Sequence, residues 1–351
     1  MKNRRAPLLI LLALLILVGL VVTGWLVGLF TKEHPLLEYA TRIALPNSEA
    51  VYPYFWLSDQ ELLLYGDSPL VQTSSMFHWD TISKTRRDLP SFTDNINNNG
   101  YGPAYMEISP NSEWALWSKA ENAGGGVYYS RLDGTGYEDY AESRPNTSLW
   151  MDNHRWVYFE HNSKYPNWDI VQAKIHNVTT KSLQKLPISA DSPLQRGYEI
   201  SMCVNSDAHV FTWIQDDSAK TADKFDIVEA DLNAQGMPVR RFSIPLPMGS
   251  RVDELVFSPH FDRIAYLLTQ QQVAPWEALV HRFYPAFAVH THWYMRLFVS
   301  RLNGTGGHTL GSVETDPDMS VFPPVHELKW LPNGNQVSFV CRDELYTLPI
   351  H

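Results

Sequence analysis

One motif recurs six times between Leu36 and the C-terminus, and this repeat limits the folds that the chain can adopt. Each copy has a short apolar strand, a turn rich in Ser, Pro, Asn or Asp, and then an aromatic or β-branched strand. The six copies read FWLSDQELLLY from Phe55, MEISPNSEWALW from Met106, LWMDNHRWVYF from Leu149, MCVNSDAHVFTW from Met202, LVFSPHFDRIAYL from Leu255 and LKWLPNGNQVSFV from Leu328. Units this small expose unpaired strand edges when they stand alone, so the repeats must assemble side by side.

A third strand follows every copy, and a fourth, more polar strand follows the first five. The sixth copy ends at Ile350 without a fourth strand. Ala40–Pro46, with the sequence ATRIALP, is the candidate for the missing strand because it resembles TRRDLP in the first repeat. If this segment pairs beside residues 344–348, the ring closes and no free edge remains. The sequence therefore predicts an all-β fold, a six-bladed β-propeller closed by an N-terminal strand in the last blade, rather than an open repeat array.

The turns SPN, SPH and LPNG, followed by the strands WALW, IAYL and VSFV, resemble the WD-like repeats of TolB-type propellers. Strands that end in LDGTG and LNGTG share this resemblance, and the propeller domains of prolyl-oligopeptidase-type enzymes are similar. The resemblance covers about Leu36 to His351, and it implies a fold without implying a function. The copies at Leu149 and Met202 depart from it, because MDNHRW and VNSDAH replace the usual turn.

The N-terminus carries Lys2, Arg4 and Arg5 and then runs without a charge from Leu8 to Phe30. A helix over this run would be about 34 Å long at ~1.5 Å per residue, enough to span a bilayer core. A signal peptide is the alternative, but its apolar region is shorter and ends at a small-residue cleavage site.

The expected organisation is a cytoplasmic basic tail (1–6), one transmembrane helix (7–30), a linker (31–38) and the propeller (39–351). Because the basic flank stays in the cytoplasm, we expect a single-pass protein of an inner or plasma membrane. Its propeller would then lie on the periplasmic or extracytoplasmic side.

The formal net charge of −10 argues against nucleic acid as a partner, because phosphate-binding surfaces need clustered Lys and Arg. The chain has no Gly-x-Ser-x-Gly elbow, no Gly-x-x-x-x-Gly-Lys phosphate loop and no His-Glu-x-x-His motif. We therefore expect a protein-binding or scaffold subunit of a membrane or envelope complex, with no cofactor and no catalytic residues. The alternative is a small-ligand or metal-dependent enzyme with its site in the channel, as in some six-bladed propeller hydrolases.

Alternation along the first strand of each copy separates two sets of side chains. Residues one and three positions before the turn are nearly all apolar and are expected to pack between blades. The intervening residues, among them Trp56 and Leu149, are expected to face the central channel or its rim. The predicted channel-binding residues are Tyr54, Tyr105, Glu107, Glu254, Glu327 and Lys329. Their charges favour either a bound cation or basic group, or pairing among themselves.

Residues 270–292 form an insertion in the fifth repeat with the sequence QQQVAPWEALVHRFYPAFAVHTH. Pro275 suits the first turn of a helix, and apolar side chains follow it at helical spacing. A surface this apolar either docks a partner protein or folds over the channel mouth. The predicted partner-binding residues are Trp276, Leu279, Val280, Phe283, Tyr284 and Phe287.

Strand order places this insertion and the linker on opposite faces of the ring, so contact between the insertion and the anchor's own bilayer is not expected. His290 and His292 would point the same way on a strand, as a shared metal ion requires. No metal site is predicted, because only Glu277 and His281 lie nearby to complete the ligand set.

Overall fold

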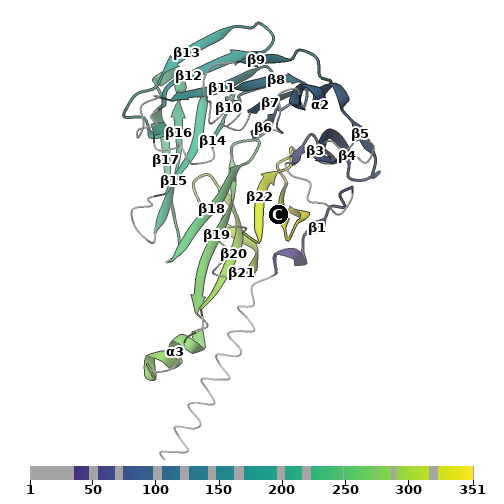
Figure 1. The fold of residues 1–351 in the computed structure, drawn as a ribbon. Helices are drawn as coiled ribbons and strands as arrows, with labels where there is room; N and C mark the ends of the chain where they lie inside the picture. Colours follow the sequence, from purple (N-terminus) through teal and green to yellow (C-terminus); the bar gives the residue numbers. More distant parts are fainter. Residues whose placement is uncertain are drawn as a thin grey trace, which may run out of the picture.

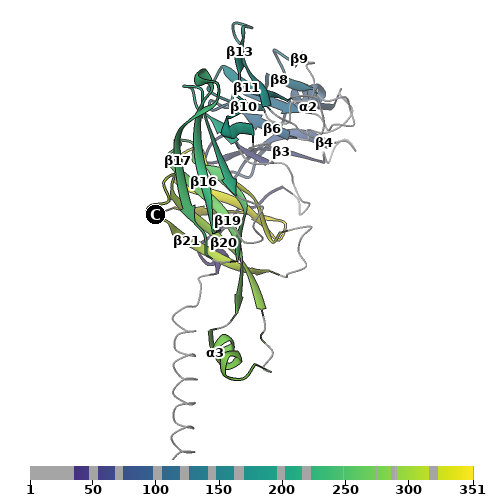
Figure 2. The same cartoon turned by 90° about the vertical axis from the view of Figure 1, so that its left-hand side faces the viewer.

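The computed structural model describes residues 35–46, 54–67, 74–97, 105–118, 126–140, 148–161, 170–195, 202–215, 223–247, 249–273, 275–285, 289, 291–315 and 323–350. These residues form six antiparallel sheets of four strands each, which we call blades 1 to 6 (Figures 1 and 2). The six-bladed propeller predicted from the repeat is therefore confirmed. The predicted tail, anchor and first part of the linker (1–34) lie outside the described residues.

Each repeat supplies three or four consecutive strands of one blade. Blade 1 contains β2 (Tyr54–Trp56), β3 (Glu61–Asp67), β4 (Ser74–Asp80) and β5 (Arg86–Asp88). Blade 2 contains β6 (Tyr105–Ile108), β7 (Trp114–Ser118), β8 (Val127–Arg131) and β9 (Glu138–Tyr140). Blade 3 contains β10 (Ser148–Trp150), β11 (Arg155–His161), β12 (Ile170–Asn177) and β13 (Leu183–Pro187).

The second half of the chain follows the same order. Blade 4 contains β14 (Met202–Val204), β15 (His209–Gln215), β16 (Lys224–Asp231) and β17 (Met237–Pro245), with a short 3-10 helix, η4 (Leu232–Ala234), before β17. Blade 5 contains β18 (Ser250–Phe257), β19 (Arg263–Val273), β20 (Thr291–Arg301) and β21 (His308–Thr315). Blade 6 contains β22 (Val325–Trp330), β23 (Gln336–Cys341), β24 (Glu344–Pro349) and the N-terminal strand β1 (Thr41–Arg42).

The N-terminal strand lies where the sequence predicts it. β1 pairs antiparallel with β24, with Thr41 opposite Thr347 and Arg42 opposite Tyr346. Just before it, the 3-10 helix η1 (Leu36–Glu38) buries Leu36, which is 1% exposed, in the hydrophobic cluster between blades 5 and 6. Packing of the propeller therefore begins within the segment that the sequence assigns to the linker.

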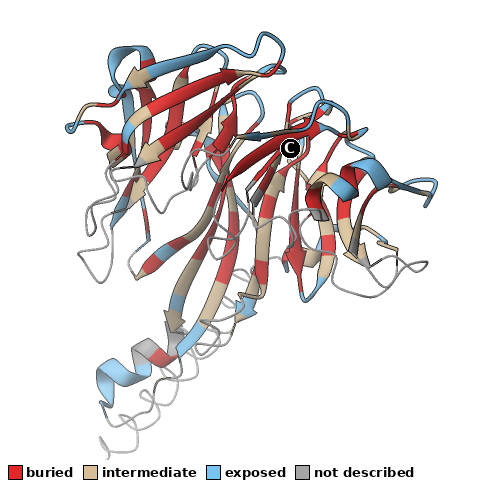
Figure 3. Ribbon diagram, turned by 45° about the horizontal axis from the view of Figure 1, so that its top comes forward, coloured by how far each residue is buried: buried red, intermediate tan, exposed pale blue. Residues whose placement is uncertain are grey.

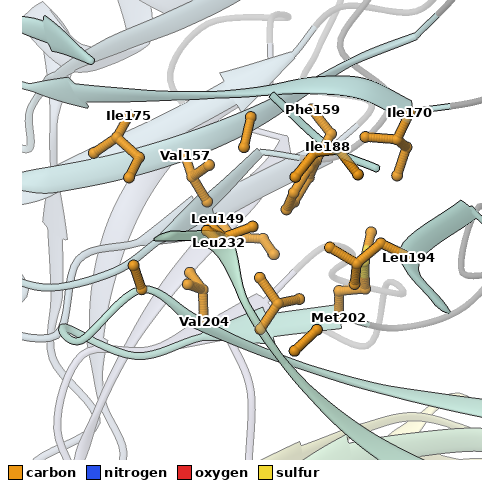
Figure 4. Close-up of a cluster of buried hydrophobic side chains, with 14 of the residues drawn as sticks. Leu149, Val157, Phe159, Ile170, Ile175, Ile188, Leu194, Met202, Val204 and Leu232 are labelled. Atoms are coloured by element: carbon orange, nitrogen blue, oxygen red, sulfur yellow. The ribbon is translucent and has the colours of Figure 1, made fainter. Parts of the chain in front are cut away.

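Six hydrophobic clusters fill the spaces between successive blades, including the space between blade 6 and blade 1. Figure 3 shows buried residues running through the strands while the turns are exposed. Figure 4 shows the cluster between blades 3 and 4, where Leu149 and Val157 face Met202 and Val204. Because each sheet has a neighbour on both faces, side chains on both faces of a strand become core.

One helix was not predicted. α2 (Pro90–Asn97) follows blade 1 and buries Phe92 and Ile96 in the cluster between blades 1 and 2. The LDGTG turn of blade 2 passes close to it: Gly134 has a φ of +85°, and a Cβ there would lie 2.5 Å from the Cβ of Ser91. Only glycine fits both the backbone conformation and this contact.

The insertion in blade 5 forms a projecting arm, which we define as residues 271–293. Three residue pairs, from Gln271–Trp293 to Val273–Thr291, extend the β19–β20 ladder past Ser250, the first residue of β18. The helix α3 (Pro275–Phe283) follows β19, and both views show it at the far end of the arm, away from the six sheets (Figures 1 and 2). The predicted helix and its start at Pro275 are confirmed.

Candidate functional site

Three of the predicted channel residues meet where blade 6 contacts blade 1. The Lys329 Nζ donates a hydrogen bond to the Tyr54 carbonyl oxygen at 2.6 Å and pairs with Glu327 Oε2 at 2.8 Å. The Tyr54 hydroxyl in turn donates to the Glu327 carbonyl oxygen at 2.6 Å. The ammonium also lies 4.2 Å from the centroid of the Tyr54 ring, a cation–π distance. These groups therefore fasten the last blade to the first.

Glu254 belongs to the same region of the ring. Its Oε1 accepts a hydrogen bond from the Leu328 backbone N–H at 2.9 Å, so blade 5 is joined to blade 6. Burial raises the pKa of this carboxyl from 4.5 to about 7; the charge of Glu327 adds to the rise, while the Leu328 N–H and Lys329 oppose it. Glu254 thus changes charge near neutral pH.

Glu107 makes an equivalent contact in another part of the ring. Its Oε2 accepts a hydrogen bond from the Trp150 backbone N–H at 3.0 Å, which joins blade 2 to blade 3. Burial, aided by the negative charge of Glu107, raises the pKa of the Cys203 thiol well above its ordinary value. The side chain of Tyr105, the remaining predicted channel residue, lies outside the described residues.

The assignment of all intervening positions to the channel is wrong for two residues. Trp56 is 9% exposed and packs between blades 6 and 1, and Leu149 is 3% exposed and packs between blades 3 and 4. In a propeller the channel is bordered by the edge of the innermost strand, so both faces of that strand point toward neighbouring blades. Successive side chains of this strand therefore alternate between the preceding blade and the following blade. They do not alternate between the core and the channel.

Sequence reasoning missed a set of tryptophan hydrogen bonds that join neighbouring blades. The indole Nε1 of Trp150 donates to the Glu107 carbonyl at 3.3 Å, and that of Trp330 donates to the Val256 carbonyl at 3.1 Å. The Trp56 indole donates to Ser338 Oγ at 2.8 Å. Trp150 and Trp330 occupy the same position of the repeat, and this recurrence of an N–H donor was the available clue.

The arm carries the predicted partner-binding residues. Phe283 is 77% exposed, Tyr284 62% and Val280 36%, and their spacing along the chain puts them on one side of the helix end. The side chains of Trp276, Leu279 and Phe287 lie outside the described residues. Glu277 is buried, whereas His281 and Arg282 are exposed.

The Nδ1 of His292, on the arm, lies within hydrogen-bond distance of Glu314 Oε1, at 2.8 Å. Within the described ranges, no group of three or more His, Cys, Asp and Glu side chains is placed to hold a metal ion. In those same ranges, no helix is both long and apolar enough to cross a membrane. Cys203 and Cys341 are free thiols.

We expect Glu254→Gln to flatten the pH dependence of stability. Because the folded-state pKa is raised, the carboxyl contributes stability below its ordinary pKa of 4.5, and this contribution is lost as the pH rises through about 7. The loss is on the order of 2–3 kcal/mol, allowing for partial solvent screening. Glutamine keeps an oxygen for the Leu328 N–H but does not titrate, so the variant should be more stable than the wild type at alkaline pH.

Urea denaturation of the two proteins from pH 5 to pH 8.5 measures this difference. Glu113→Gln is the matched control, because Glu113 is an exposed acid at a turn of blade 2. Parallel stability curves for Glu254→Gln and the wild type across this range would contradict the raised pKa.

Comparison with known proteins supports the fold and does not identify a function. No protein-family model and no curated protein matches this chain. TolB from Acinetobacter baumannii is 12% identical, with a TM-score of 0.44 over 78% of this chain and 56% of its own. An oligogalacturonate lyase from Vibrio parahaemolyticus is 10% identical, with a TM-score of 0.46 over 89% of this chain and 93% of its own. A prolyl endopeptidase is 10% identical, with a TM-score of 0.49 over 83% of this chain and 46% of its own.

The chain thus spans little more than half of the TolB structure. The resemblance to TolB-type and prolyl-oligopeptidase-type propellers is confirmed as a resemblance of fold. At such identities and TM-scores, the activities and ligands of these proteins are not transferred to this chain.

Proposed function

We propose that the protein is a membrane-anchored, extracytoplasmic propeller that acts as a protein-binding subunit of a membrane or envelope complex. The anchor is the uncharged run from Leu8 to Phe30, and the basic N-terminal tail sets its orientation. The propeller provides a rigid ring that positions its loops and its arm.

The observation that supports this proposal is that the acidic residues on the innermost strands are engaged in contacts within the ring. Glu107, Glu254 and Glu327 are each engaged in holding one blade to the next or in pairing with Lys329. These contacts give the acids a structural role in holding the ring together. Among the large apolar side chains of the described residues, Phe283 on the arm has the highest exposed fraction.

The second candidate is a small-ligand or metal-dependent enzyme with its site in the channel. One observation favours it: a carboxyl group whose pKa lies near 7 is suited to general acid–base catalysis. Glu254 would then be the catalytic residue, and Glu254→Gln would abolish a turnover that Glu113→Gln leaves intact.

The test of the proposed function uses the full chain with a C-terminal affinity tag, solubilised from its native membranes in mild detergent. We expect the chain to resist alkaline carbonate extraction and to co-purify with membrane proteins in near-stoichiometric amounts. A Glu254→Gln chain should retain those partners, because the residue stabilises the ring without facing a partner. Recovery of the chain alone, monodisperse in several mild detergents, would contradict a role as a binding subunit.

A further inference from the structure

The arm carries exposed apolar side chains at a distance from the propeller. In both views α3 lies beyond the end of the sheets, on the two-stranded part of the β19–β20 ladder (Figures 1 and 2). Val280, Phe283 and Tyr284 are exposed there, three and four positions apart along the chain, and we call these three residues the arm tip. Single exposed apolar residues are ordinary, but two large aromatic rings beside a valine on a projecting helix indicate a surface that is covered in use.

The N-terminal segment enters the described structure on the blade that carries the arm. Pro35 forms a bridge with Ser312 of β21, the outermost strand of blade 5, and Leu36 packs between blades 5 and 6. The sequence had placed the linker and the insertion on opposite faces of the ring. Pro35 instead contacts the outermost strand of the same blade whose second and third strands carry the insertion, so the reason for excluding bilayer contact no longer holds.

The strands of the arm extend about as far from the blade as the segment before Pro35 can extend. Ser312 is opposite Arg296, and five residues of β20 separate Arg296 from Thr291, about 17 Å at ~3.4 Å per residue. Phe30, the last residue of the uncharged run, is also five residues from Pro35, again about 17 Å at full extension. A bilayer surface at Phe30 can therefore lie level with Thr291, where the strands of the arm end, and α3 lies farther out than that level.

The chemistry of the tip suits the interfacial region of a bilayer. Aromatic rings and short aliphatic side chains partition into the boundary between head groups and acyl chains, and Tyr is enriched there. Arg282 and His281 are exposed on the same short helix and can meet lipid phosphates, whereas the acid Glu277 is buried. The tip is thus locally basic and apolar in a chain whose net charge is −10.

We propose that the arm tip inserts into the head-group region of the same bilayer that holds Leu8–Phe30, so that the propeller rests on the membrane at two points. This inference rests on the proposed anchor. It names the bilayer, rather than a partner protein, as the occupant of the exposed tip. With a second contact, the propeller is held in one orientation, since attachment at one point alone would leave it free to turn.

The experiment uses the full chain reconstituted into vesicles of phosphatidylcholine with a minority of phosphatidylglycerol. An environment-sensitive fluorophore is attached to Phe283→Cys, and in a second protein to Ile82→Cys. Ile82 is 66% exposed and lies in the β4–β5 turn, at the end of its blade opposite the arm side. The pKa values of both native thiols are raised by burial, so labelling is directed to the introduced cysteine.

We expect the probe at position 283 to brighten roughly threefold in vesicles and to be quenched by lipids labelled near the head group, as a shallow insertion requires. The probe at position 82 should stay unchanged. Val280→Ser with Tyr284→Ser should reduce the signal at position 283 while leaving the melting temperature as it was, because both side chains are exposed.

The outcomes separate the two proposals. A chain that floats with the vesicles but keeps a water-exposed probe at position 283 overturns the membrane contact and leaves the anchor standing. A chain that does not float with the vesicles, or that alkaline carbonate releases from the membrane, overturns the anchor and this inference together. Loss of a co-purifying protein in the Val280→Ser, Tyr284→Ser chain, together with an unquenched probe, would assign the tip to a protein instead.

Discussion

Trp156→Ala is expected to lower the free energy of unfolding by about 3–5 kcal/mol, the range for removing a large aromatic side chain from a core. Trp156 lies in β11, is 0% exposed and packs in the cluster between blades 2 and 3. Its ring centroid is 5.4 Å from that of His176, 5.5 Å from Tyr158 and 5.7 Å from Tyr140. Alanine would remove all of these contacts and leave a cavity that the surrounding sheets are too rigid to close.

The indole nitrogen of Trp156 is buried without a hydrogen-bond partner among the described residues, so the predicted loss comes from packing alone. Burial lowers the pKa of His176 from 6.5, and water entering the cavity should return it toward that value. Urea denaturation measures the first effect and NMR titration of the imidazole measures the second. Trp156→Phe is the matched control and should lose less, because a ring remains. A change below about 1 kcal/mol for Trp156→Ala would contradict the packing described here.

Leu36→Ala is expected to cost about 2–5 kcal/mol, although the residue lies outside every repeat. Leu36 is 1% exposed between blades 5 and 6 and fixes the segment that leads into β1. β1 itself forms only two residue pairs with β24, and so it depends on this buried side chain to stay in place. Once β1 detaches, the edge of β24 is open to pairing with another chain.

Chemical denaturation, hydrogen exchange of the Ile43 amide and light scattering together test this prediction. Ile43 donates its N–H to the Leu345 carbonyl at 2.9 Å, so its exchange reports directly on the β1–β24 junction. Leu37→Ala is the control on the same short helix, because Leu37 is only partly buried and should lose less. Unchanged exchange of Ile43 in Leu36→Ala would show that β1 holds its position without this contact.

The repeat was sufficient to predict the fold because each copy carries its own turn and its own alternation. Even blades 3 and 4, where MDNHRW and VNSDAH replace the usual turn, follow the spacing of the others. The helix α2 was missed although Pro90 suits a first helical position and Phe92 and Ile96 have helical spacing. The helix lies between a fourth strand and the next blade, where the repeat predicts no element.

The candidate site was predicted less well, and the reason is geometric. A single strand cannot reveal how many neighbours its sheet has, so Trp56 and Leu149 were assigned to a channel that they do not reach. The charged residues Glu254, Glu327 and Lys329 do lie near one another, because charges on adjacent innermost strands have few other positions available. Which acid binds which backbone N–H depends on the stagger between blades, and that stagger is not encoded in one strand.

Closure of the ring by β1 also has a consequence for biosynthesis. Thr41 pairs with Thr347, and the Tyr54 hydroxyl bonds the Glu327 carbonyl across 273 positions of sequence. The ribosome must therefore release nearly the whole polypeptide before its earliest strand can find a neighbour. Until then, five folded blades and an unpaired strand edge form an intermediate that matures slowly and is prone to aggregate. A nascent chain of this kind depends on being shielded while it emerges, and truncation by even one C-terminal strand should leave it unable to mature.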